Sequence, residues 1–582
     1  MQSEPSLFVI IKGYFGSFSR KAVWVIIILG FLVFLPSLGN GFLGDDNAQV
    51  VDNILIRSPK NIPSFFAGGS FYLDNSKLAG VYYKPLTLSV YAVLYSIFRL
   101  SPAAFHFFQI IFHILNAILI FYIFKRFFNE KISLVAALIF LVHPINSASV
   151  FYVSNFQEVL FFFFGALGFW FLSRPGYLNS VAAVIYLSLS LLSKETGLLF
   201  IIISLIYLLI YKRDNFFRFL AQSLMVLSVY LTLKICAVGL ITNPKNTNIA
   251  LLSLGKRLLN FPEIILFYIR KFVFPVTLVS SNRWVYLNLS FRHFFLPLII
   301  DLVVLGAGIL VLILIQKKKP EHFRTALFFG SWLLLGLLFH SQVIPLDFTV
   351  SERWFYFPIV GALGLIAAAW QILNFKNKQK ALMAFVVAVI ALFSARTFIR
   401  GFDWKNDETL ITKDFRYLHD DYAVQDYLAT KAIKNRDLNS ALNYANKSVA
   451  LFPYFTNHNT LGGVYYHLKN YDQAQKTYLE GLNYGDYQTL YKNLAVVTIL
   501  KNDMKNDAPM LEELMRKGKQ SPWLYLGLAV LKYNSGNEDE AKTLISKAYE
   551  TGKNDEAISY AYLQILNSRP LELKFNTEFD AQ

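Results

Sequence analysis

Long apolar segments separated by short basic loops occupy the first two thirds of the chain. Segments such as 294–316 and 181–193 consist mainly of Val, Leu, Ile, Phe and Ala, and are too apolar for a water-exposed surface. Eleven segments can cross a bilayer as helices, near residues 22–39, 104–124, 132–150, 151–172, 178–193, 195–211, 217–240, 294–316, 325–343, 355–374 and 380–399. The pattern predicts an all-α, polytopic membrane helix bundle of about eleven transmembrane helices over residues 1–400.

The remainder of the chain, residues 401–582, has a different and repetitive pattern. Four alanines recur at spacings of 33, 34 and 33 residues, at positions 441, 474, 508 and 541. This is the period of tetratricopeptide helix pairs, in which small residues permit close helix crossing. The third repeat fits less well, because Pro509 would have to lie in the first turn of its second helix. We therefore expect a tetratricopeptide-like helical repeat domain over 401–582, with repeats at about 425–550.

Basic residues predict the orientation of the bundle. With a cytoplasmic N-terminus, the loops that would lie inside are rich in Lys and Arg, as the positive-inside rule requires. They carry Lys125, Arg126, Lys131, Arg174, Lys212, Arg213, Arg218, Lys317, Lys318, Lys319, Arg324, Lys376, Lys378 and Lys380. A further apolar segment, 83–100, would invert every later loop if it crossed, so we expect it to lie along the interface. Loops 39–105 and 241–293 and the repeat tail then face outward.

The N-terminal segment and the cellular location follow the same reasoning. Lys12, Arg20 and Lys21 precede the first apolar run, and no convincing cleavage site follows it, so we expect an uncleaved signal anchor. The predicted location is the bacterial inner membrane, with the N-terminus in the cytoplasm and the repeat tail in the periplasm.

Composition supports the membrane class and narrows the chemistry. Hydrophobic residues make up 55% of the chain, charged residues 16%, and the mean hydropathy is +0.42. The net charge of +17 belongs to the first 400 residues, which hold 34 Lys and Arg against 14 Asp and Glu. These cations lie in loops between apolar segments, which disfavours nucleic acid as a partner. Cys236 is the only cysteine, which excludes disulfide frameworks, Cys-based zinc sites and iron–sulfur clusters.

Acidic residues next to the apolar segments are the first candidates for catalysis. Asp45 and Asp46 follow the first segment, and adjacent carboxylates there favour a general base together with a partner for a cation or a hydroxyl. The alternative is an ordinary helix cap. Glu158 lies near the start of the fourth apolar segment, where an acid facing lipid is improbable; a structural acid bonded to Ser154 or Asn155 is the alternative.

Polar residues at other segment ends complete the candidate set. His143, which alone would usually be structural, ends the third segment; Lys194 and Glu195 form an adjacent pair that either neutralises itself or binds a ligand. Lys84 and Arg353 lie on the predicted outer side, where Arg353 is flanked by Glu352 and Tyr356. Arg and Lys there favour binding of an anionic group such as a phosphate, although anchoring to lipid headgroups remains an alternative for the basic loop at 256–271.

In combination these residues resemble the GT-C superfamily of membrane glycosyltransferases, in particular the transmembrane-and-tetratricopeptide-repeat protein O-mannosyltransferases and their bacterial relatives. The resemblance rests on the order of short motifs: Gly44-Asp45-Asp46, Tyr82-Tyr83-Lys84-Pro85-Leu86, Phe105-His106 with His113 and Asn116, His143-Pro144-Ile145, Val150-Phe151-Tyr152-Val153-Ser154 with Glu158, Leu192-Ser193-Lys194-Glu195, Glu352-Arg353-Trp354-Phe355-Tyr356, and Arg400 with Trp404.

The resemblance implies a polyprenyl-phosphate sugar donor bound at the outer leaflet, with inversion at the anomeric carbon. It implies that Asp45 is the catalytic base with Asp46 as the alternative, that Glu158 lines the donor cavity, and that Lys84 and Arg353 bind phosphate. His143, Lys194, Glu195, Glu352 and Tyr356 are the further expected substrate-binding residues. Related eukaryotic members tend to have Arg at the position of Lys84, which keeps the cation.

Three questions stay open at this point. Asp45 and Asp46 together with water could hold a divalent cation, Mg²⁺ or Mn²⁺, but Lys84 and Arg353 could supply the same electrostatic stabilisation. The acceptor is expected to be protein, with transfer to a lipid or cell-envelope glycan as the alternative. A third interpretation is a membrane-anchored repeat scaffold without activity, in which the tail alone binds a partner.

Overall fold

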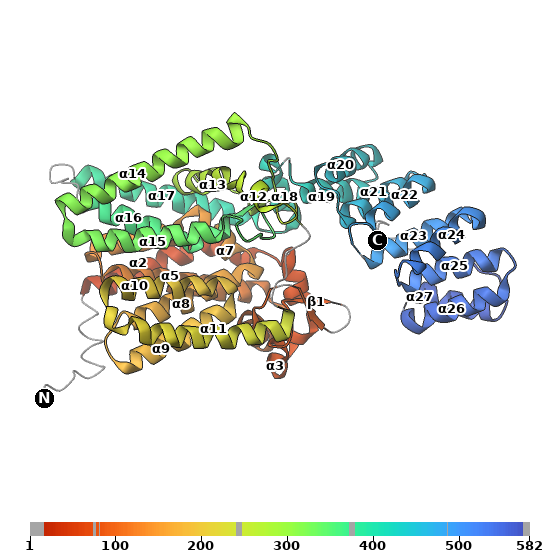
Figure 1. Cartoon of the computed structure of the whole chain (residues 1–582), viewed down its shortest axis with the longest axis horizontal. Helices are drawn as coiled ribbons and strands as arrows, with labels where there is room; N and C mark the ends of the chain where they lie inside the picture. Colours follow the sequence, from red (N-terminus) through yellow and green to blue (C-terminus); the bar gives the residue numbers. More distant parts are fainter. Residues whose placement is uncertain are drawn as a thin grey trace. The chain divides into compact units, whose positions relative to one another are not determined.

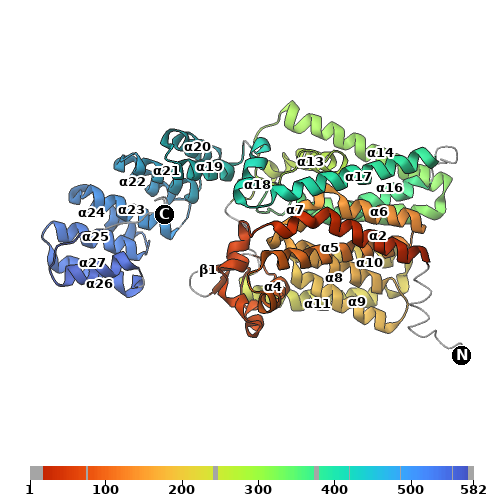
Figure 2. The same cartoon turned by 180° about the vertical axis from the view of Figure 1, so that it is seen from behind.

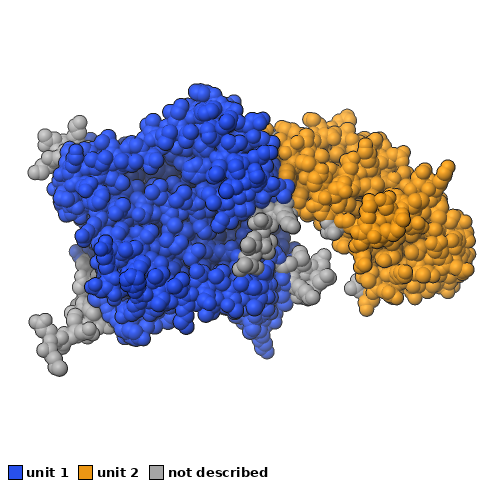
Figure 3. Space-filling view, in the orientation of Figure 1, with its two compact units in different colours: residues 1–417 blue, residues 418–582 orange. Residues whose placement is uncertain are grey.

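The computed structural model describes residues 17–73, 77–80, 82–239, 247–371, 379–418, 420–485, 487–553 and 555–573. Lys12, Lys376, Lys378 and the first residues of the loop predicted at 241–293 lie outside these ranges. The chain divides into two compact units, residues 1–417 and 418–582, which Figure 3 colours separately. The predicted boundary at Arg400 is therefore too early.

The reason for the later boundary is a buried ion pair at the end of the last long apolar helix. Arg400 Nη2 lies 2.8 Å from a carboxylate oxygen of Asp414, and both side chains are almost completely buried. This pair ties helix α18 (Asp407–Asp414) to the end of α17 (Gln379–Asp403), so that the segment after Arg400 packs as part of the membrane unit.

The first unit is a bundle of long helices (Figures 1 and 2). Its α-helices are α2 (Ser17–Phe34), α3 (Ile62–Phe65), α4 (Pro85–Phe98), α5 (Pro102–Phe124), α6 (Glu130–Val142), α7 (Ser147–Phe151), α8 (Phe156–Leu172), α9 (Tyr177–Ser193), α10 (Leu198–Tyr211), α11 (Phe216–Val238), α12 (Leu254–Leu258), α13 (Phe261–Val273), α14 (Leu296–Lys318), α15 (Phe323–Phe339), α16 (Pro358–Trp370), α17 (Gln379–Asp403) and α18 (Asp407–Asp414).

The helices agree in type and place with the eleven predicted segments. Within the described residues, seven helices are long and apolar enough to cross a membrane, and an eighth span results if the bent pair α6 and α7 is counted as one. The 48° bend of that pair falls at His143-Pro144, where proline lacks an N–H and the preceding residue is extended. Helices α9, α10 with its preceding turn, and α16 are shorter apolar helices. Helix α4 has 14 residues, fewer than the roughly 20 that a crossing needs.

Several of the predicted inside loops meet at one end of the bundle. Arg126 Nη2 and Lys212 Nζ donate hydrogen bonds of 2.7 and 2.9 Å to the same acceptor, the carbonyl oxygen of Ser173. Lys125 Nζ lies 2.7 Å from the hydroxyl of Ser19 in the first turn of α2. The clustering agrees with the positive-inside pattern, while the orientation itself stays a prediction.

The opposite end of the bundle is formed by the loops predicted to carry the chemistry. Strand β1 (Phe71–Leu73) pairs antiparallel with β2 (Lys77–Ala79), with Phe71 opposite Ala79. Strand β3 (Ser281–Asn282) pairs antiparallel with β4 (Val350–Ser351), with Ser281 opposite Ser351. The second pair joins the long loop after α13 to the chain immediately before Arg353, and so fixes where the turn 352–356 begins.

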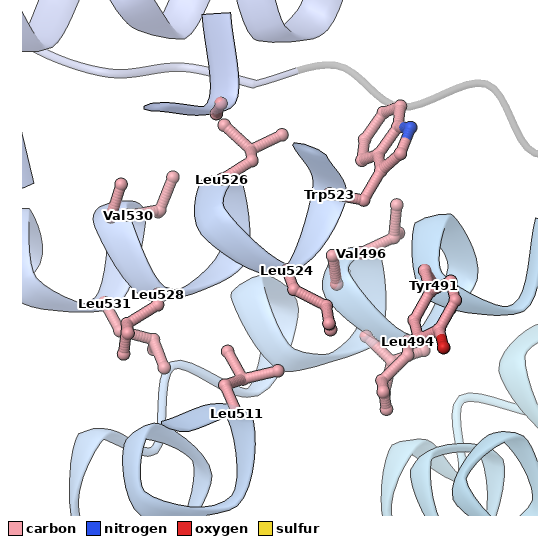
Figure 4. Close-up of a cluster of buried hydrophobic side chains, with 14 of the residues drawn as sticks. Tyr491, Leu494, Val496, Leu511, Trp523, Leu524, Leu526, Leu528, Val530 and Leu531 are labelled. Carbon is pink, nitrogen blue, oxygen red and sulfur yellow. The ribbon is translucent and has the colours of Figure 1, made fainter. Parts of the chain in front are cut away.

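The second unit consists of helix pairs α19 (Tyr422–Lys434) to α27 (Glu556–Leu566), which follow the predicted period. The helices between are α20 (Leu438–Leu451), α21 (Phe455–His467), α22 (Tyr471–Gly481), α23 (Gln488–Lys501), α24 (Met504–Arg516), α25 (Pro522–Asn534) and α26 (Glu538–Gly552). The four repeating alanines are buried. Figure 4 shows the core that α23 and α25 build with Leu511 of α24.

One detail of the repeat prediction is wrong. Helix α24 begins at Met504, after the N-cap Asp503 accepts a hydrogen bond from the backbone of Asn506, so Pro509 lies inside the helix and not in its first turn. Gly462 fits the prediction, because a Cβ there would come within 2.2 Å of the Tyr478 ring, and only glycine permits this crossing. The assignment to the tetratricopeptide class stays a prediction.

Candidate functional site

Asp46 is held inside the protein by three hydrogen bonds. One carboxylate oxygen accepts from the backbone N–H of Leu43 at 2.9 Å. The other lies 2.6 Å from the backbone nitrogen and 2.5 Å from the hydroxyl of Ser154, in the turn before α8. Burial raises the pKa of Asp46 to about 7, against the opposing effect of these hydrogen bonds. Asp46 thus joins the first outer loop to the start of α8, and its oxygens are already occupied.

Asp45, in contrast, is exposed, while its backbone is fixed. Its N–H donates a 2.7 Å hydrogen bond to the hydroxyl of Tyr152, which follows α7. The preceding Gly44 has φ +43°, and its N–H donates to a carboxylate oxygen of Asp407 in α18 at 3.0 Å. A Cβ on Gly44 would lie 2.9 Å from the Tyr152 oxygen. The turn therefore requires glycine, both for this close approach and for the positive φ. The two hydrogen bonds fix the backbone of Gly44 and Asp45, and the Asp45 side chain is exposed at this end of the bundle.

Lys84 is a buried cation close to Asp45. It is 7% exposed, immediately precedes α4, and its ammonium lies 4.9 Å from the centre of the Tyr82 ring. Burial and the positive charges of Arg353 and Lys194 lower its pKa to about 8, whereas the charges of Asp45 and Asp347 act in the opposite direction. Among the described residues no carboxylate lies within ion-pair distance of Lys84. Such a lysine is suited to receive an anionic ligand group.

Arg353 and Lys194 share one carboxylate partner, Glu158. Glu158 is 1% exposed in the first turn of α8 and forms an ion pair with Lys194. Arg353 Nε lies 3.9 Å from the same carboxylate oxygen, and Arg353 Nη1 donates to the side-chain oxygen of Asn155 at 2.5 Å. The expectation that Glu158 faces the bundle interior is confirmed. One buried carboxylate therefore faces two cations.

The structure adds residues that the sequence did not single out for the site. Asp347, in the segment before β4, hydrogen-bonds the hydroxyl of Tyr82; burial, followed by the Asp347 charge, raises the Tyr82 pKa far above its usual value. Asp347 also acts electrostatically on Lys84 and Arg353. The sequence could have pointed to Asp347, because it is the one charged residue in the segment 341–350, on the predicted outer side. Asp407 carries no such signal, and Tyr152 belongs to a motif of the resemblance that gave it no role, because both contact a turn more than 100 residues away in the sequence.

Glu195 lies beside the group but has a cation of its own. Its carboxylate is 2.9 Å from the ammonium of Lys234 in α11, and the side chain of Glu195 is 29% exposed. The sequence left open whether Lys194 and Glu195 neutralise each other. In the structure they do not, because Glu195 pairs with Lys234 and Lys194 with Glu158. The pair Glu195 and Lys234 connects α10 to α11 at this end of the bundle.

Three predicted substrate-binding residues serve internal contacts instead. Glu352 is fully buried, accepts from the backbone N–H of Val279 at 2.8 Å and lies 3.6 Å from Lys271. Both ring nitrogens of His143 are engaged, one with the carbonyl oxygen of Phe272 at 3.0 Å and one with the N–H of Ile145 at 3.2 Å.

Tyr356 is likewise buried among protein groups. Its hydroxyl lies 2.7 Å from His113 Nδ1 and 3.1 Å from the amide nitrogen of Asn116. Glu352, His143 and Tyr356 are therefore better explained as packing residues than as ligands of a substrate.

The aspartate pair fits a divalent cation poorly. Both oxygens of Asp46 accept hydrogen bonds from N–H or O–H groups, which leaves Asp45 as the available carboxylate of the pair. Within the described part of the chain, no group of three or more His, Cys, Asp or Glu is arranged to hold a metal ion. The nearby charges of Lys84 and Arg353 also disfavour a cation at this position. The residues fit an anion better.

Comparisons with known proteins give similarities to mannosyltransferases over defined parts of the chain. The family model described as dolichyl-phosphate-mannose-protein mannosyltransferase matches residues 84–242, a stretch that begins at Lys84 and contains Glu158 and Lys194. Human protein O-mannosyl-transferase TMTC3 is 23% identical over 607 aligned residues, which cover 94% of this chain. The protein O-mannosyl-transferase F38B6.6 of Caenorhabditis elegans is 24% identical over 408 residues, 66% of this chain. The chain is similar to these mannosyltransferases.

The relationship has a defined extent. The alignment with human TMTC3 spans 66% of that protein's length, slightly less than two thirds, and the one with the Caenorhabditis elegans protein spans 56%. Among solved structures, ArnT from Cupriavidus metallidurans bound to undecaprenyl phosphate matches 70% of this chain and 80% of its own, with a TM-score of 0.40 and 16% identity. The alignment with human TMTC3, which covers 94% of this chain, extends over both of its compact units.

Proposed function

We propose that this chain transfers a sugar from a polyprenyl-phosphate donor to an acceptor hydroxyl on protein, at the outer face of the membrane. The observation that carries the proposal is the exposed carboxylate of Asp45 beside Lys84, a buried cation without a carboxylate partner in the described residues. The description of the matching family, a dolichyl-phosphate-mannose-protein mannosyltransferase, supports a donor and an acceptor of these classes.

In the proposed reaction each group has one task. Asp45 accepts the proton of the acceptor hydroxyl, whose oxygen forms the new bond to the anomeric carbon. The bond between that carbon and the phosphate oxygen breaks, and its electron pair leaves with the phosphate. Lys84 and Arg353 stabilise the negative charge that develops there. Attack from the side opposite the phosphate inverts the anomeric carbon.

The surrounding residues hold these groups in place. Glu158 pairs with Lys194 and orients Arg353, and Asp347 with Tyr82 forms the wall next to Lys84. In this proposal the fixed cations Lys84 and Arg353, and not a metal ion, offset the charge of the leaving phosphate. The repeat unit would recruit the acceptor or a protein partner.

Transfer of labelled sugar in membranes that contain the full chain tests the proposal. We expect more label from a polyprenyl-phosphate sugar in protein bands of these membranes than in protein bands of membranes that lack the chain. Label that is extracted with organic solvent would instead favour transfer to a lipid or an envelope glycan. If no polyprenyl-phosphate sugar is used while deletion of residues 418–582 alone reproduces the loss-of-function phenotype, the scaffold interpretation is correct.

A further inference from the structure

A polar pocket lies at the far end of α8 from Glu158. Helix α8 starts beside the candidate site and ends at Leu172, where the following turn forms a pocket of about 360 Å³ together with α9, α10 and α11. The first turns of two long helices open into it, Gly176 to Ser180 of α9 and Asn215 to Arg218 of α11. Helix N-termini carry unsatisfied N–H groups and a partial positive charge, and thus attract anions.

Two of the cations that line this pocket, Lys212 and Arg218, have no carboxylate partner among the described residues, and Arg126 lies next to Lys212. Lys212 shares the Ser173 carbonyl with Arg126, and Arg218 donates to the side-chain oxygen of Asn215 at 3.1 Å. In the described part of the chain, Arg126, Lys212 and Arg218 form no ion pair with a carboxylate within 4 Å. Burial and the charge of Arg126 lower the pKa of Lys212, as expected for cations gathered without an anion.

A second, apolar groove continues from this pocket between α9 and α11. It has a volume of about 390 Å³, is lined by residues such as Val184 and Val226, and shares Gln222 with the polar pocket. The side-chain oxygen of Gln222 is buried without a hydrogen-bond partner among the described residues. Leu178 and Phe217, large apolar side chains in the first turns of α9 and α11, are 80% and 77% exposed, as expected for contact with lipid.

We propose that the pocket and the groove together bind an anionic phospholipid, with the headgroup phosphate among Lys212, Arg218 and the two helix N-termini and an acyl chain between α9 and α11. A free phosphate would use the pocket and leave the groove unused. A zwitterionic lipid would use the groove but bring its own cation into a pocket that already holds several. The combination of a cationic pocket with a continuous apolar groove favours an anionic lipid over both.

Lipid binding by the purified full chain in detergent tests this directly. Native mass spectrometry would compare phosphatidylglycerol with phosphatidylcholine of the same acyl chains. We expect preferential retention of phosphatidylglycerol, and a loss of about fivefold in its affinity for each cation removed in Lys212→Gln and Arg218→Gln. Arg213→Gln is the matched control, because Arg213 is an exposed neighbour that does not line the pocket. Equal weakening by Arg213→Gln would overturn the site in favour of diffuse surface charge.

Two further measurements identify the occupant. Val226→Trp fills the groove and should weaken phosphatidylglycerol without affecting the pocket. If inorganic phosphate competes with phosphatidylglycerol at similar concentration and Val226→Trp has no effect, the site binds a soluble anion and the lipid proposal fails. Thermal unfolding without added lipid checks the variants; should the double change Lys212→Gln/Arg218→Gln destabilise the protein, the single change at the exposed Arg218 decides.

Discussion

The hydroxyl of Tyr152 accepts a 2.7 Å hydrogen bond from the backbone N–H of Asp45. Tyr152 belongs to the turn between α7 and α8, and Asp45 to the first outer loop, so this bond joins two segments far apart in the sequence. Ser154, two residues after Tyr152, binds the carboxylate of Asp46. The turn at 152–154 therefore separates the roles of two adjacent aspartates, holding one inside the protein and presenting the other to solvent.

Tyr152→Phe should lower sugar transfer with little loss of protein. The change removes the acceptor for the Asp45 N–H and keeps the ring, so the loop loses a hydrogen bond worth about 0.5–1.5 kcal/mol. We expect transfer to fall by about 2- to 10-fold, measured as kcat/KM in membranes. Asp407→Asn is a suitable control, because its amide oxygen still accepts from Gly44. Unchanged transfer in Tyr152→Phe would show that the position of Asp45 does not depend on this bond.

Donor binding should depend on two cations of the site. Lys84→Ala and Arg353→Ala each remove a charge that would contact the donor phosphate, and we expect donor affinity to fall by roughly 2–5 kcal/mol per variant. Equilibrium binding of a polyprenyl-phosphate sugar to purified protein measures this. Lys256→Ala, an exposed lysine in α12, is the control. Donor affinity equal to that of the wild type in both site variants would mean that the cations have a structural role.

The sequence predicts those features of the fold and the candidate site that depend on residues close together in the chain. Apolar length predicts the membrane helices, and Pro144 marks the bend, because both are local properties of the chain. The cations Lys84, Lys194 and Arg353 and the acid Glu158 stand out because charges among apolar segments are costly unless paired or used. The structure brings them together as expected from the resemblance, although their roles in binding and catalysis stay predictions.

What the sequence could not provide was the partner of each charged residue. Glu352 adjoins Arg353 in sequence, and both lie in the short 3₁₀ turn from Glu352 to Tyr356. The Glu352 side chain nevertheless contacts Lys271, whereas that of Arg353 contacts Glu158. Lys194 and Glu195 are also adjacent, and each pairs with a different helix. Neighbouring residues at a break between helices point in different directions, so adjacency overestimates the size of a site.

Protein stability should depend on pH through Asp46. Burial raises the pKa of Asp46 to about 7 from its ordinary value of 3.8, so the folded protein keeps a proton that the unfolded chain has lost. The free energy of unfolding should therefore fall as pH rises from about 4 to about 7, by on the order of 1.4 kcal/mol per pH unit, and this contribution should be constant above that range. Glu352, with its pKa raised to about 7, acts in the same direction.

The free energy of unfolding of the purified Asp46→Asn variant, measured from pH 4 to pH 8, isolates the contribution of Asp46 to the pH dependence. The variant should show a smaller decrease in stability between pH 5 and 7 than the wild type, because its amide does not titrate. Glu352→Gln should remove the other part of the slope. An unchanged slope in Asp46→Asn would show that the Asp46 carboxyl does not titrate in this range.

The orientation of the bundle is a separate prediction. In a Cys236→Ser background, a cysteine placed at Lys131 should be protected from a membrane-impermeant maleimide in intact inner-membrane spheroplasts, whereas one at Asn435 should react. The expectation follows from the excess of Lys and Arg in the loops at the Lys131 end. Reaction at Lys131 together with protection at Asn435 would reverse the topology and place Asp45 in the cytoplasm.

Asp45→Asn decides between an enzyme and a scaffold. The substitution keeps the size of the side chain and the backbone bond to Tyr152, but removes the carboxylate that would accept the acceptor proton. Since positioned general bases contribute about 10²–10⁴-fold, transfer should fall by that order while donor affinity and protein level remain near those of the wild type.

Asp46→Asn tests whether the effect on transfer is specific to Asp45. Asp46→Asn should lower stability by about 1–3 kcal/mol, because one of the buried donors of Leu43 or Ser154 loses its acceptor, and should affect transfer less than Asp45→Asn does in protein that remains folded. If Asp46→Asn abolishes transfer in folded protein while Asp45→Asn does not, Asp46 is the base. If neither variant changes transfer, the pair serves only to shape the loop, and the base must be sought among Glu158 and Asp347, the other acids beside the three cations.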